Sequence, residues 1–210
     1  MDWNFATLET AKRYKLLAGL VIPRPIALIS TQSAAGVVNA APFSFFNVMA
    51  DDPPIVIVSI ENRVDGRMKD SGRNILESGE FVVNLVDEAI AERMHGCAAD
   101  LPPEVSEIEA VGFSTAPSTA IKPPRIAQAP VALECKLHQR LTMKTRELII
   151  GEVVWLHAQD GIVEPDTLRI RTENYFPVAR FYANRYARTR DQFTVESNTY
   201  NETMKRLGRA

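Results

Sequence analysis

The chain has little of what disulfide-rich, zinc-binding and membrane-spanning proteins need. Two of its 210 residues are cysteines, Cys97 and Cys135, and they lie far apart without a CxxC motif. This usage fits a reducing compartment and indicates neither structural zinc nor a disulfide framework. Apolar runs such as PPIVIVSI are too short to span a bilayer, and the N-terminus does not resemble a secretion signal. We therefore expect a soluble, cytoplasmic protein without a membrane partner.

Signatures of several catalytic classes are also missing. The sequence has no GxSxG nucleophile motif, no GxGxxG fingerprint and no GxxxxGK[ST] phosphate loop. His95, His138 and His157 lack metal-ligand spacing. The last two lie on two long predicted strands and could be near each other if those strands pair, but one pair is not a site. The net charge of −2, without a long block of one sign, does not favour nucleic acid. We assign no catalytic residue and no metal ligand.

What the sequence does contain is a series of β-branched segments separated by short turns. Strands are predicted over 23–32, 53–62, 80–86, 131–143 and 147–163, with a returning strand after a turn at Gly36. Helices are predicted over 7–18, from the capping residues Asp70 and Ser71 to Gly79, and over 87–100. Since the helices are few and do not alternate with the strands, an antiparallel sheet or barrel is expected. The length favours one domain, and the proline-rich excursion over 101–130 is typical of a functional or interfacial segment.

The segment DGRMKDSGRN suits an anion. It places Lys69, Ser71 and Asn74 at the start of a predicted helix, with Arg63 and Arg67 nearby. Free amides and the helix dipole favour a phosphate there, and a lysine and a hydroxyl would complete the site. The alternative is that Asp70 or Ser71 only caps the helix and the cations are solvated.

The stretch NAAPFSFFNVMADDPP suits a flat ring. Phe43, Phe45 and Phe46 supply apolar area, while Ser44, Asn47 and backbone amides can bond to carbonyl groups at a ring edge. The alternative is that the three phenylalanines belong to the core.

Together these segments resemble the flavin reductase-like family with the FMN-binding split barrel, which includes flavoredoxin and nitrilotriacetate monooxygenase component B. The resemblance covers about residues 14–193 and rests on RPIALIST, NAAPFSFFN, KDSGRNI, GEFVVNLV and PVARFYANRYARTRDQF. It implies a mainly β fold, an antiparallel Greek-key split β-barrel with a few flanking helices, forming a homodimer. It also implies that Asn39, Ser44, Phe45, Phe46 and Asn47 line the isoalloxazine ring of FMN and that Lys69, Ser71 and Asn74 lie at its phosphate. From the anion segment we add Arg63 to the predicted phosphate site. One departure is that Phe181 and Tyr182 follow Arg180, where the family commonly has small residues.

The resemblance implies a flavin reductase that transfers a hydride from NAD(P)H to FMN, which is either a prosthetic group or an exchanged substrate. A monooxygenase or another electron-acceptor protein would then be a partner. A second hypothesis is an FMN electron-transfer protein of flavoredoxin type, reduced by a protein partner. A third is a binding module without enzymatic activity, in which the aromatic cluster is only core and the late arginines serve nucleic acid.

Overall fold

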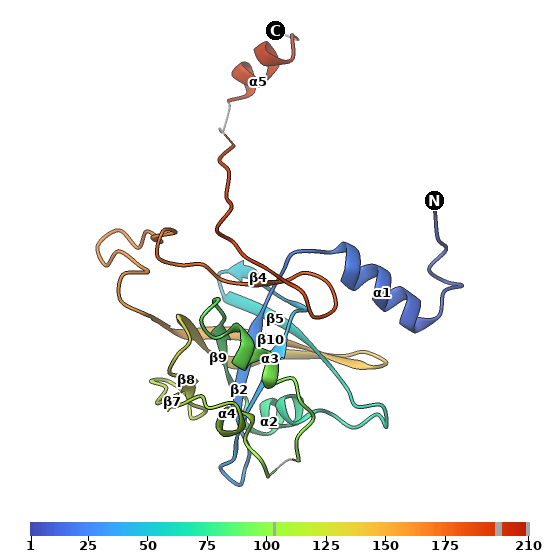
Figure 1. Cartoon of the computed structure of the whole chain (residues 1–210), viewed down its shortest axis with the longest axis vertical. Helices are drawn as coiled ribbons and strands as arrows, with labels where there is room; N and C mark the ends of the chain where they lie inside the picture. The colour runs from blue at the N-terminus through green and yellow to red at the C-terminus, as the bar shows by residue number, and fades with distance from the viewer. Residues whose placement is uncertain (103, 196–198, 209–210) are drawn as a thin grey trace.

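One seven-stranded antiparallel sheet organises the computed structural model, which describes residues 1–102, 104–195 and 199–208 (Figure 1). The strand order is β3-β2-β6-β9-β10-β5-β4. Strands β9 and β10 are the longest and form a hairpin. The strands are β2 (Ala27–Gln32), β3 (Val38–Phe43), β4 (Phe46–Asp51), β5 (Pro54–Glu61), β6 (Glu80–Leu85), β9 (Val131–Thr142) and β10 (Arg146–Ala158).

The sheet closes on itself through the aromatic stretch. Its two edge strands, β3 and β4, are consecutive in the chain, and only Ser44 and Phe45 connect them. A connection of two residues bridges only about 10 Å, so the two edges must lie close together and the sheet must curl into a barrel. The amide of Ser59 donates to the carbonyl of Phe45 at 2.8 Å, which ties this connection to β5.

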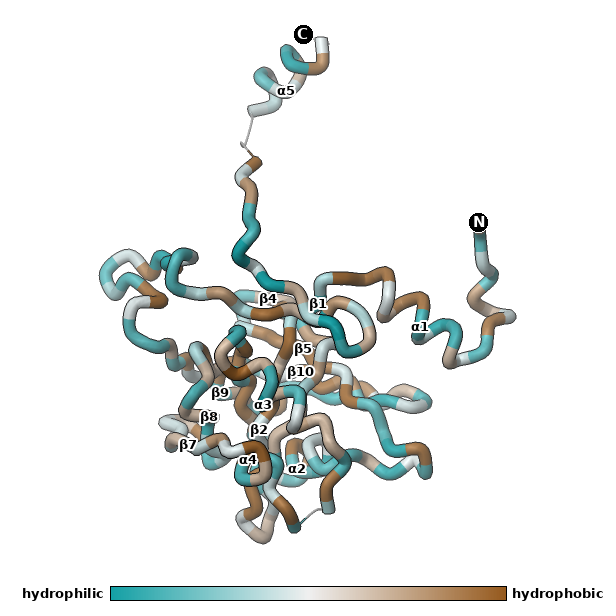
Figure 2. Tube along the Cα trace, in the orientation of Figure 1, coloured by the Kyte–Doolittle hydropathy of each residue, from teal (hydrophilic) through white to brown (hydrophobic). Residues whose placement is uncertain are grey.

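Alternating side chains of β2 enter two separate cores. Ala27 and Ile29 pack with Val58, Phe81 and other residues of the barrel interior. Leu28, which lies between them, packs in a second cluster beneath the short helices and the excursion. Successive side chains on a strand point to opposite faces, so one strand serves both cores. Figure 2 shows that hydrophobic residues run through the strands of the barrel.

The helices lie around the barrel rather than between its strands. Helix α2 (Asp70–Ser78) contacts β2, β3 and β6, and it ends at Gly79, whose φ of 72° is the left-handed conformation that glycine adopts without strain. Helix α1 (Thr10–Leu20) precedes the barrel, and α5 (Tyr200–Arg206) stands apart from it in Figure 1. The remaining helices are the short α3 (Ala91–Gly96) and α4 (Glu107–Ala110). None of the helices in the described residues is long and apolar enough to cross a membrane.

Short strands complete the fold. Strands β1 (Arg24–Pro25), β11 (Ala179–Arg180) and β12 (Tyr186–Ala187) form a three-stranded sheet, which brings the late aromatic segment beside the start of the barrel. Strands β7 (Thr115–Ala116) and β8 (Arg125–Ile126) form a hairpin within the proline-rich excursion.

The excursion is fixed to the barrel by three buried polar side chains on neighbouring strands. Ser30 donates to the carbonyl of Pro124 at 2.7 Å, and Asn84 accepts from the amide of Ile126 at 2.8 Å. Glu134 accepts from two amides of the excursion, those of Thr119 and Ala120, each at 2.7 Å. Because all three side chains are fully buried, their polar atoms need these partners.

The predicted antiparallel barrel with few helices is confirmed, and so are the five predicted strands, the first of which is split into β1 and β2, and the helix that Gly79 ends. The predicted helix over 87–100 is reduced to the short α3. Three details are wrong. The N-cap of α2 is Lys69, without a side-chain cap, and not Asp70 or Ser71. β4 and α5 were not predicted as elements. His138 and His157 do not form a pair, since each lies against a glutamate of the opposite strand, Glu152 and Glu134.

Candidate functional site

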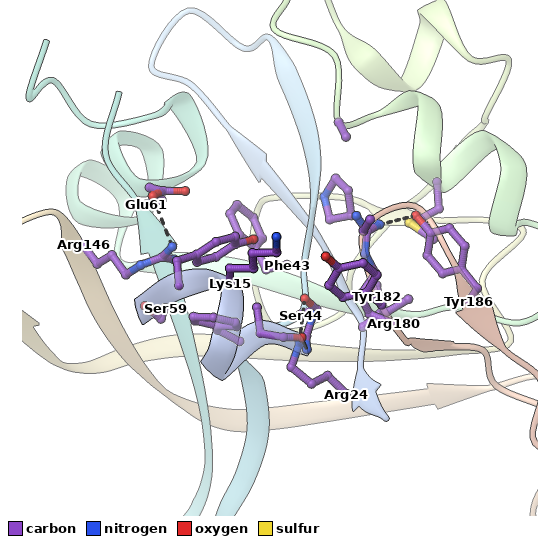
Figure 3. Close-up of a pocket in the computed structure, with 18 of the residues that line it drawn as sticks. Lys15, Arg24, Phe43, Ser44, Ser59, Glu61, Arg146, Arg180, Tyr182 and Tyr186 are labelled. Atoms are coloured by element: carbon purple, nitrogen blue, oxygen red, sulfur yellow. Dashed lines mark hydrogen bonds and ion pairs between the residues drawn. The ribbon is translucent and has the colours of Figure 1, made fainter. Parts of the chain in front are cut away.

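Two adjoining cavities lie where the aromatic stretch meets the start of α2. The aromatic cavity, of about 350 Å³, is lined by aromatic and cationic side chains, among them Tyr14, Arg24, Phe45, Arg146, Arg180, Tyr182 and Tyr186 (Figure 3). The α2 cavity, of about 1,090 Å³, is lined by polar side chains, among them Asn39, Arg63, Arg67, Asp70, Ser71 and Glu107. Pro42, Phe43, Glu61 and Lys69 line both cavities.

The N-terminus of α2 opens into the α2 cavity. Lys69 is the N-cap, and the backbone amides of Asp70, Ser71 and Gly72 have no acceptor among the described residues. Unpaired amides at a helix N-terminus, together with the dipole of the helix, favour an anion. Lys69 forms no ion pair within the described part of the chain, so its ammonium group is available to that anion.

Arg63 reaches the same end of α2 but is already paired. Its guanidinium donates to Asp70 at 3.0 Å and to Asp100 at 2.6 Å. Asp70 also accepts from Arg73 at 2.6 Å. The pKa of Arg63 is raised, first by its hydrogen bond to Asp100. Arg63 thus holds the loop before α2 in place, and Lys69 is the better placed cation for a ligand.

Ser71 and Asn39 belong to a buried hydrogen-bond network. The Ser71 hydroxyl donates to Oδ1 of Asn39 at 2.8 Å, and Nδ2 of Asn39 donates to Glu107 at 2.8 Å. Glu107 also accepts from the amide of Ala40 at 3.2 Å. Burial raises the pKa of Glu107, although these hydrogen bonds oppose the shift. Since Asn39, Ser71 and Glu107 all line the α2 cavity, the network fixes part of its wall.

Asn74 lies deeper in the same network and lines neither cavity. Its Nδ2 donates to the hydroxyl of Thr31 at 3.1 Å, and both residues are buried. Its Oδ1 is buried and has no hydrogen-bond partner among the residues that the structure describes. The position of Asn74 makes it a support for Thr31 and the network, with no direct approach to the cavity.

The aromatic stretch divides between the cavity and the core. Ser44 and Phe45 line the aromatic cavity, where the Arg146 guanidinium lies 4.8 Å from the ring centre of Phe45. Phe46 is only 8% exposed and packs in the barrel core. Asn47 is exposed on β4 and accepts from the amide of Val48, away from both cavities.

The structure therefore brings together six of the nine sequence-predicted site residues: Asn39, Ser44, Phe45, Arg63, Lys69 and Ser71. It places Phe46, Asn47 and Asn74 elsewhere. Local patterns in the sequence did not point to Glu107, Tyr14 and Arg146, which come from α4, α1 and β10 and reach the cavities only through packing. Three other residues of the aromatic cavity did carry a signal in the sequence: Arg24 begins the RPIALIST segment, and Arg180 and Tyr182 lie in the PVARFYANRYARTRDQF segment.

Other reactive groups are poor candidates. Cys97 and Cys135 are free and buried, and burial raises the pKa of the Cys97 thiol to about 12. Within the described ranges no three His, Cys, Asp or Glu side chains are arranged to hold a metal ion.

Comparison with known proteins gives one consistent result. The sequence model of the flavin reductase like domain matches residues 19–189. The uncharacterized protein YwrF of Bacillus subtilis is 42% identical over 194 residues, which are 90% of this chain and 94% of YwrF. The 2-nitrobenzoate 2-nitroreductase NbaA of Pseudomonas fluorescens has a similar structure, with a TM-score of 0.88 and 39% identity over 95% of this chain and 98% of NbaA. Nitrilotriacetate monooxygenase component B from Bacillus cereus has a TM-score of 0.88 and 35% identity over 93% of this chain and 98% of its own.

Proposed function

Because the chain belongs to the flavin reductase-like family, we propose that it is an FMN-binding oxidoreductase that transfers a hydride from NAD(P)H to the flavin. The observation that carries this proposal is the N-terminus of α2. Its unpaired amides and Lys69 face a cavity large enough for a cofactor, and this cavity adjoins one with aromatic walls. A phosphate on one side and a flat ring on the other are what FMN presents.

The residues at the site fit FMN. Lys69 and the first amides of α2 would hold the phosphate, and Pro42, Phe43, Ser44 and Phe45 would hold the ring. Arg63 and the Asn39–Ser71–Glu107 network would keep this frame rigid. When bound, the flavin supplies the hydride-accepting chemistry. The protein then needs to bind, orient and give access, and no side chain has to act as an acid or base.

Two measurements test the proposal. The purified protein, alone or after addition of FMN, should show flavin absorbance, and the absorbance should bleach rapidly on mixing with NADH or NADPH in a stopped-flow instrument. Absence of flavin binding would contradict the whole proposal. Tight FMN binding without bleaching by either dinucleotide would favour the second candidate, an electron-transfer protein of flavoredoxin type that a protein partner reduces.

We also propose that the protein acts as a homodimer in the cytoplasm. Large apolar side chains stand exposed on the edge strand β4, with Val48 62% and Met49 53% exposed, and a second copy could cover them. The two free cysteines are consistent with a reducing compartment. Light scattering at micromolar concentration should give twice the chain mass of 23.4 kDa, and a monomer would contradict the dimer.

A monooxygenase or another electron-acceptor protein is the proposed downstream partner. This follows from the similar Bacillus cereus protein, which is a component of nitrilotriacetate monooxygenase.

A further inference from the structure

The aromatic cavity carries more positive than negative charge. Among the described residues that line it, Glu61 is the one acidic side chain, and it lies 3.2 Å from Arg146. The cavity is lined by four further cationic side chains, those of Lys15, Arg24, Lys69 and Arg180. These cations outnumber the acidic groups that could neutralise them, so the cavity favours a ligand with negative charge.

This charge matters for the ring that the proposed function places in the cavity. The isoalloxazine ring of FMN is neutral when oxidised. Reduction by a hydride adds two electrons and one proton, so one negative charge is left on the ring near neutral pH. A fixed positive charge close to the ring therefore strengthens the binding of reduced FMN more than that of oxidised FMN.

Of the cations in the cavity, Arg180 is the best placed to act on the ring. Lys69 stands at the proposed phosphate site, and Lys15 is exposed on α1, where water screens its charge. Arg24 uses Nη1 on the carbonyls at the end of α1 and Nε on the hydroxyl of Ser44 at 3.3 Å. The guanidinium of Arg180 has one hydrogen bond and no ion pair among the described residues, so most of its donors remain for a ligand.

That one hydrogen bond fixes Arg180 at the cavity. Arg180 and Tyr186 are direct partners across β11 and β12, and both line the cavity. Nη1 of Arg180 donates to the hydroxyl of Tyr186 at 2.6 Å, a bond that Figure 3 shows as a dashed line. The guanidinium centre also lies 5.0 Å from the centre of the tyrosine ring. The position of Tyr186 therefore decides where the charge of Arg180 lies.

His95 in turn holds the hydroxyl of Tyr186. Its Nδ1 lies 2.7 Å from the hydroxyl oxygen. A guanidinium only donates, so the tyrosine oxygen accepts from Arg180 and its proton is available to Nδ1 of His95. The two rings meet edge to face, with their centres 5.9 Å apart. His95 lies on α3 next to Met94, which is fully buried and lines the cavity, so the imidazole has a fixed support.

We propose that His95 and Tyr186 are positioning residues that hold Arg180 beside the flavin ring, where its charge stabilises the reduced cofactor. The chain of hydrogen bonds runs from the exposed His95 through Tyr186 to a cation inside the cavity. This inference rests on the proposed function, because it needs FMN in the aromatic cavity. It goes further in assigning roles to His95, Tyr186 and Arg180 and in predicting the redox preference of the site.

The first test removes the charge and measures the midpoint potential of bound FMN at pH 8. The full-length protein is loaded with FMN and reduced slowly with xanthine and xanthine oxidase beside a reference dye. Arg180→Gln should reduce the preference for reduced over oxidised FMN about 10-fold, which lowers the potential of this two-electron couple by about 30 mV. Arg185→Gln is the matched control, because Arg185 is exposed on the turn between β11 and β12 and does not line the cavity. Equal potentials in the two variants would overturn the proposal.

The second test removes the support and leaves the charge. Tyr186→Phe and His95→Ala should each reduce the same preference about 3-fold, or about 15 mV. His95→Asn should restore most of the loss, because its amide oxygen can accept the hydroxyl proton in place of Nδ1. Thermal unfolding of each flavin-free variant shows that the fold is intact. A wild-type potential in folded Tyr186→Phe and His95→Ala, or equal potentials in His95→Ala and His95→Asn, would overturn the positioning roles.

The titration separates this inference from the proposed function. Xanthine oxidase supplies the electrons, so the potentials can be measured even if neither NADH nor NADPH reduces the bound FMN. A protein that ignores both dinucleotides but shows the expected shifts would contradict hydride transfer and support the roles of His95, Tyr186 and Arg180. A protein that does not bind FMN would overturn both.

Discussion

Replacement of Lys69 by alanine tests the cofactor site most directly. Lys69 is the N-cap of α2, lines both cavities and forms no ion pair within the described part of the chain. Its ammonium group would be a charged donor to the FMN phosphate. Because the side chain is exposed in the protein, water screens this contact, and a loss of about 1–2 kcal/mol is expected. This is about a 5- to 30-fold rise in the dissociation constant of FMN.

Riboflavin separates a phosphate contact from a general effect. It lacks the phosphate, so Lys69→Ala should leave its affinity nearly unchanged. The FMN affinity of the wild type should fall with added salt, and that of the variant should fall less steeply. Both flavins can be titrated by quenching of their fluorescence. Lys136→Ala, which removes an exposed lysine on β9 away from both cavities, is the control.

An equal loss of affinity for FMN and riboflavin would refute the reasoning. Lys69 would then act on the ring or through the fold, and the phosphate would have to lie elsewhere. The unpaired amides of α2 remain in the variant, so a complete loss of FMN binding is not expected.

Three further predictions concern the barrel and its contacts. Phe45→Ala should weaken FMN binding and leave the stability of the flavin-free protein nearly unchanged, whereas Phe46→Ala should lower the unfolding free energy by ~3–5 kcal/mol. Similar losses of stability in both variants, measured by denaturant titration, would place Phe45 in the core. Burial disfavours ionised Glu134, but the hydrogen bonds from His157, Thr119 and Ala120 prevail and lower its pKa. The contribution of Glu134 to stability is therefore full above its unfolded-state pKa and is lost as the pH falls through its folded-state pKa. Glu134→Gln should remove this part of the loss of stability in acid, and an unchanged pH profile of the unfolding free energy would contradict the prediction. Gly151→Ala would place a Cβ 2.4 Å from Cζ of Phe81 and should cost ~1–3 kcal/mol, while Gly72→Ala, with its nearest neighbour at 3.6 Å, should show no such loss in thermal unfolding.

Local patterns in the sequence were sufficient for the elements that are long or clearly bounded. The β-branched run of β5 and the pair β9 and β10 follow from composition, and α2 follows from its glycine stop. The N-cap was misassigned because Asp70 and Ser71 are both good capping residues, yet their side chains are used elsewhere. Asp70 binds Arg63 and Arg73, and Ser71 donates to Asn39. Capping propensity describes the preference of a side chain in its local sequence. The tertiary partners of Asp70 and Ser71 compete with the backbone for these side chains.

The polar network in the wall of the α2 cavity could not be predicted from local patterns. Asn39 and Glu107 are 68 positions apart in the chain, and they meet because α4 packs on β3. Glu107 lies in the proline-rich excursion, whose path is set by its bonds to Ser30, Asn84 and Glu134 on the barrel. The sequence indicates that such an excursion is a functional or interfacial segment. Its contacts with the barrel depend on which strands lie side by side, and this cannot be read from a single sequence.

The sequence left two alternatives for the aromatic stretch, a wall for a flat ring and a part of the core. Phe45 and Phe46, which are adjacent in the chain, show that each alternative applies to a different residue. Side chains of consecutive residues in an extended chain point to opposite sides. At the point where the barrel closes, one side is the interior and the other is the aromatic cavity. Phe46 therefore fills the core, and Phe45 forms the cavity wall beneath Arg146. The two residues before β4 also join the edges of the sheet, so closure of the barrel positions the cavity wall. A change that loosens this closure should therefore weaken ligand binding before it unfolds the core.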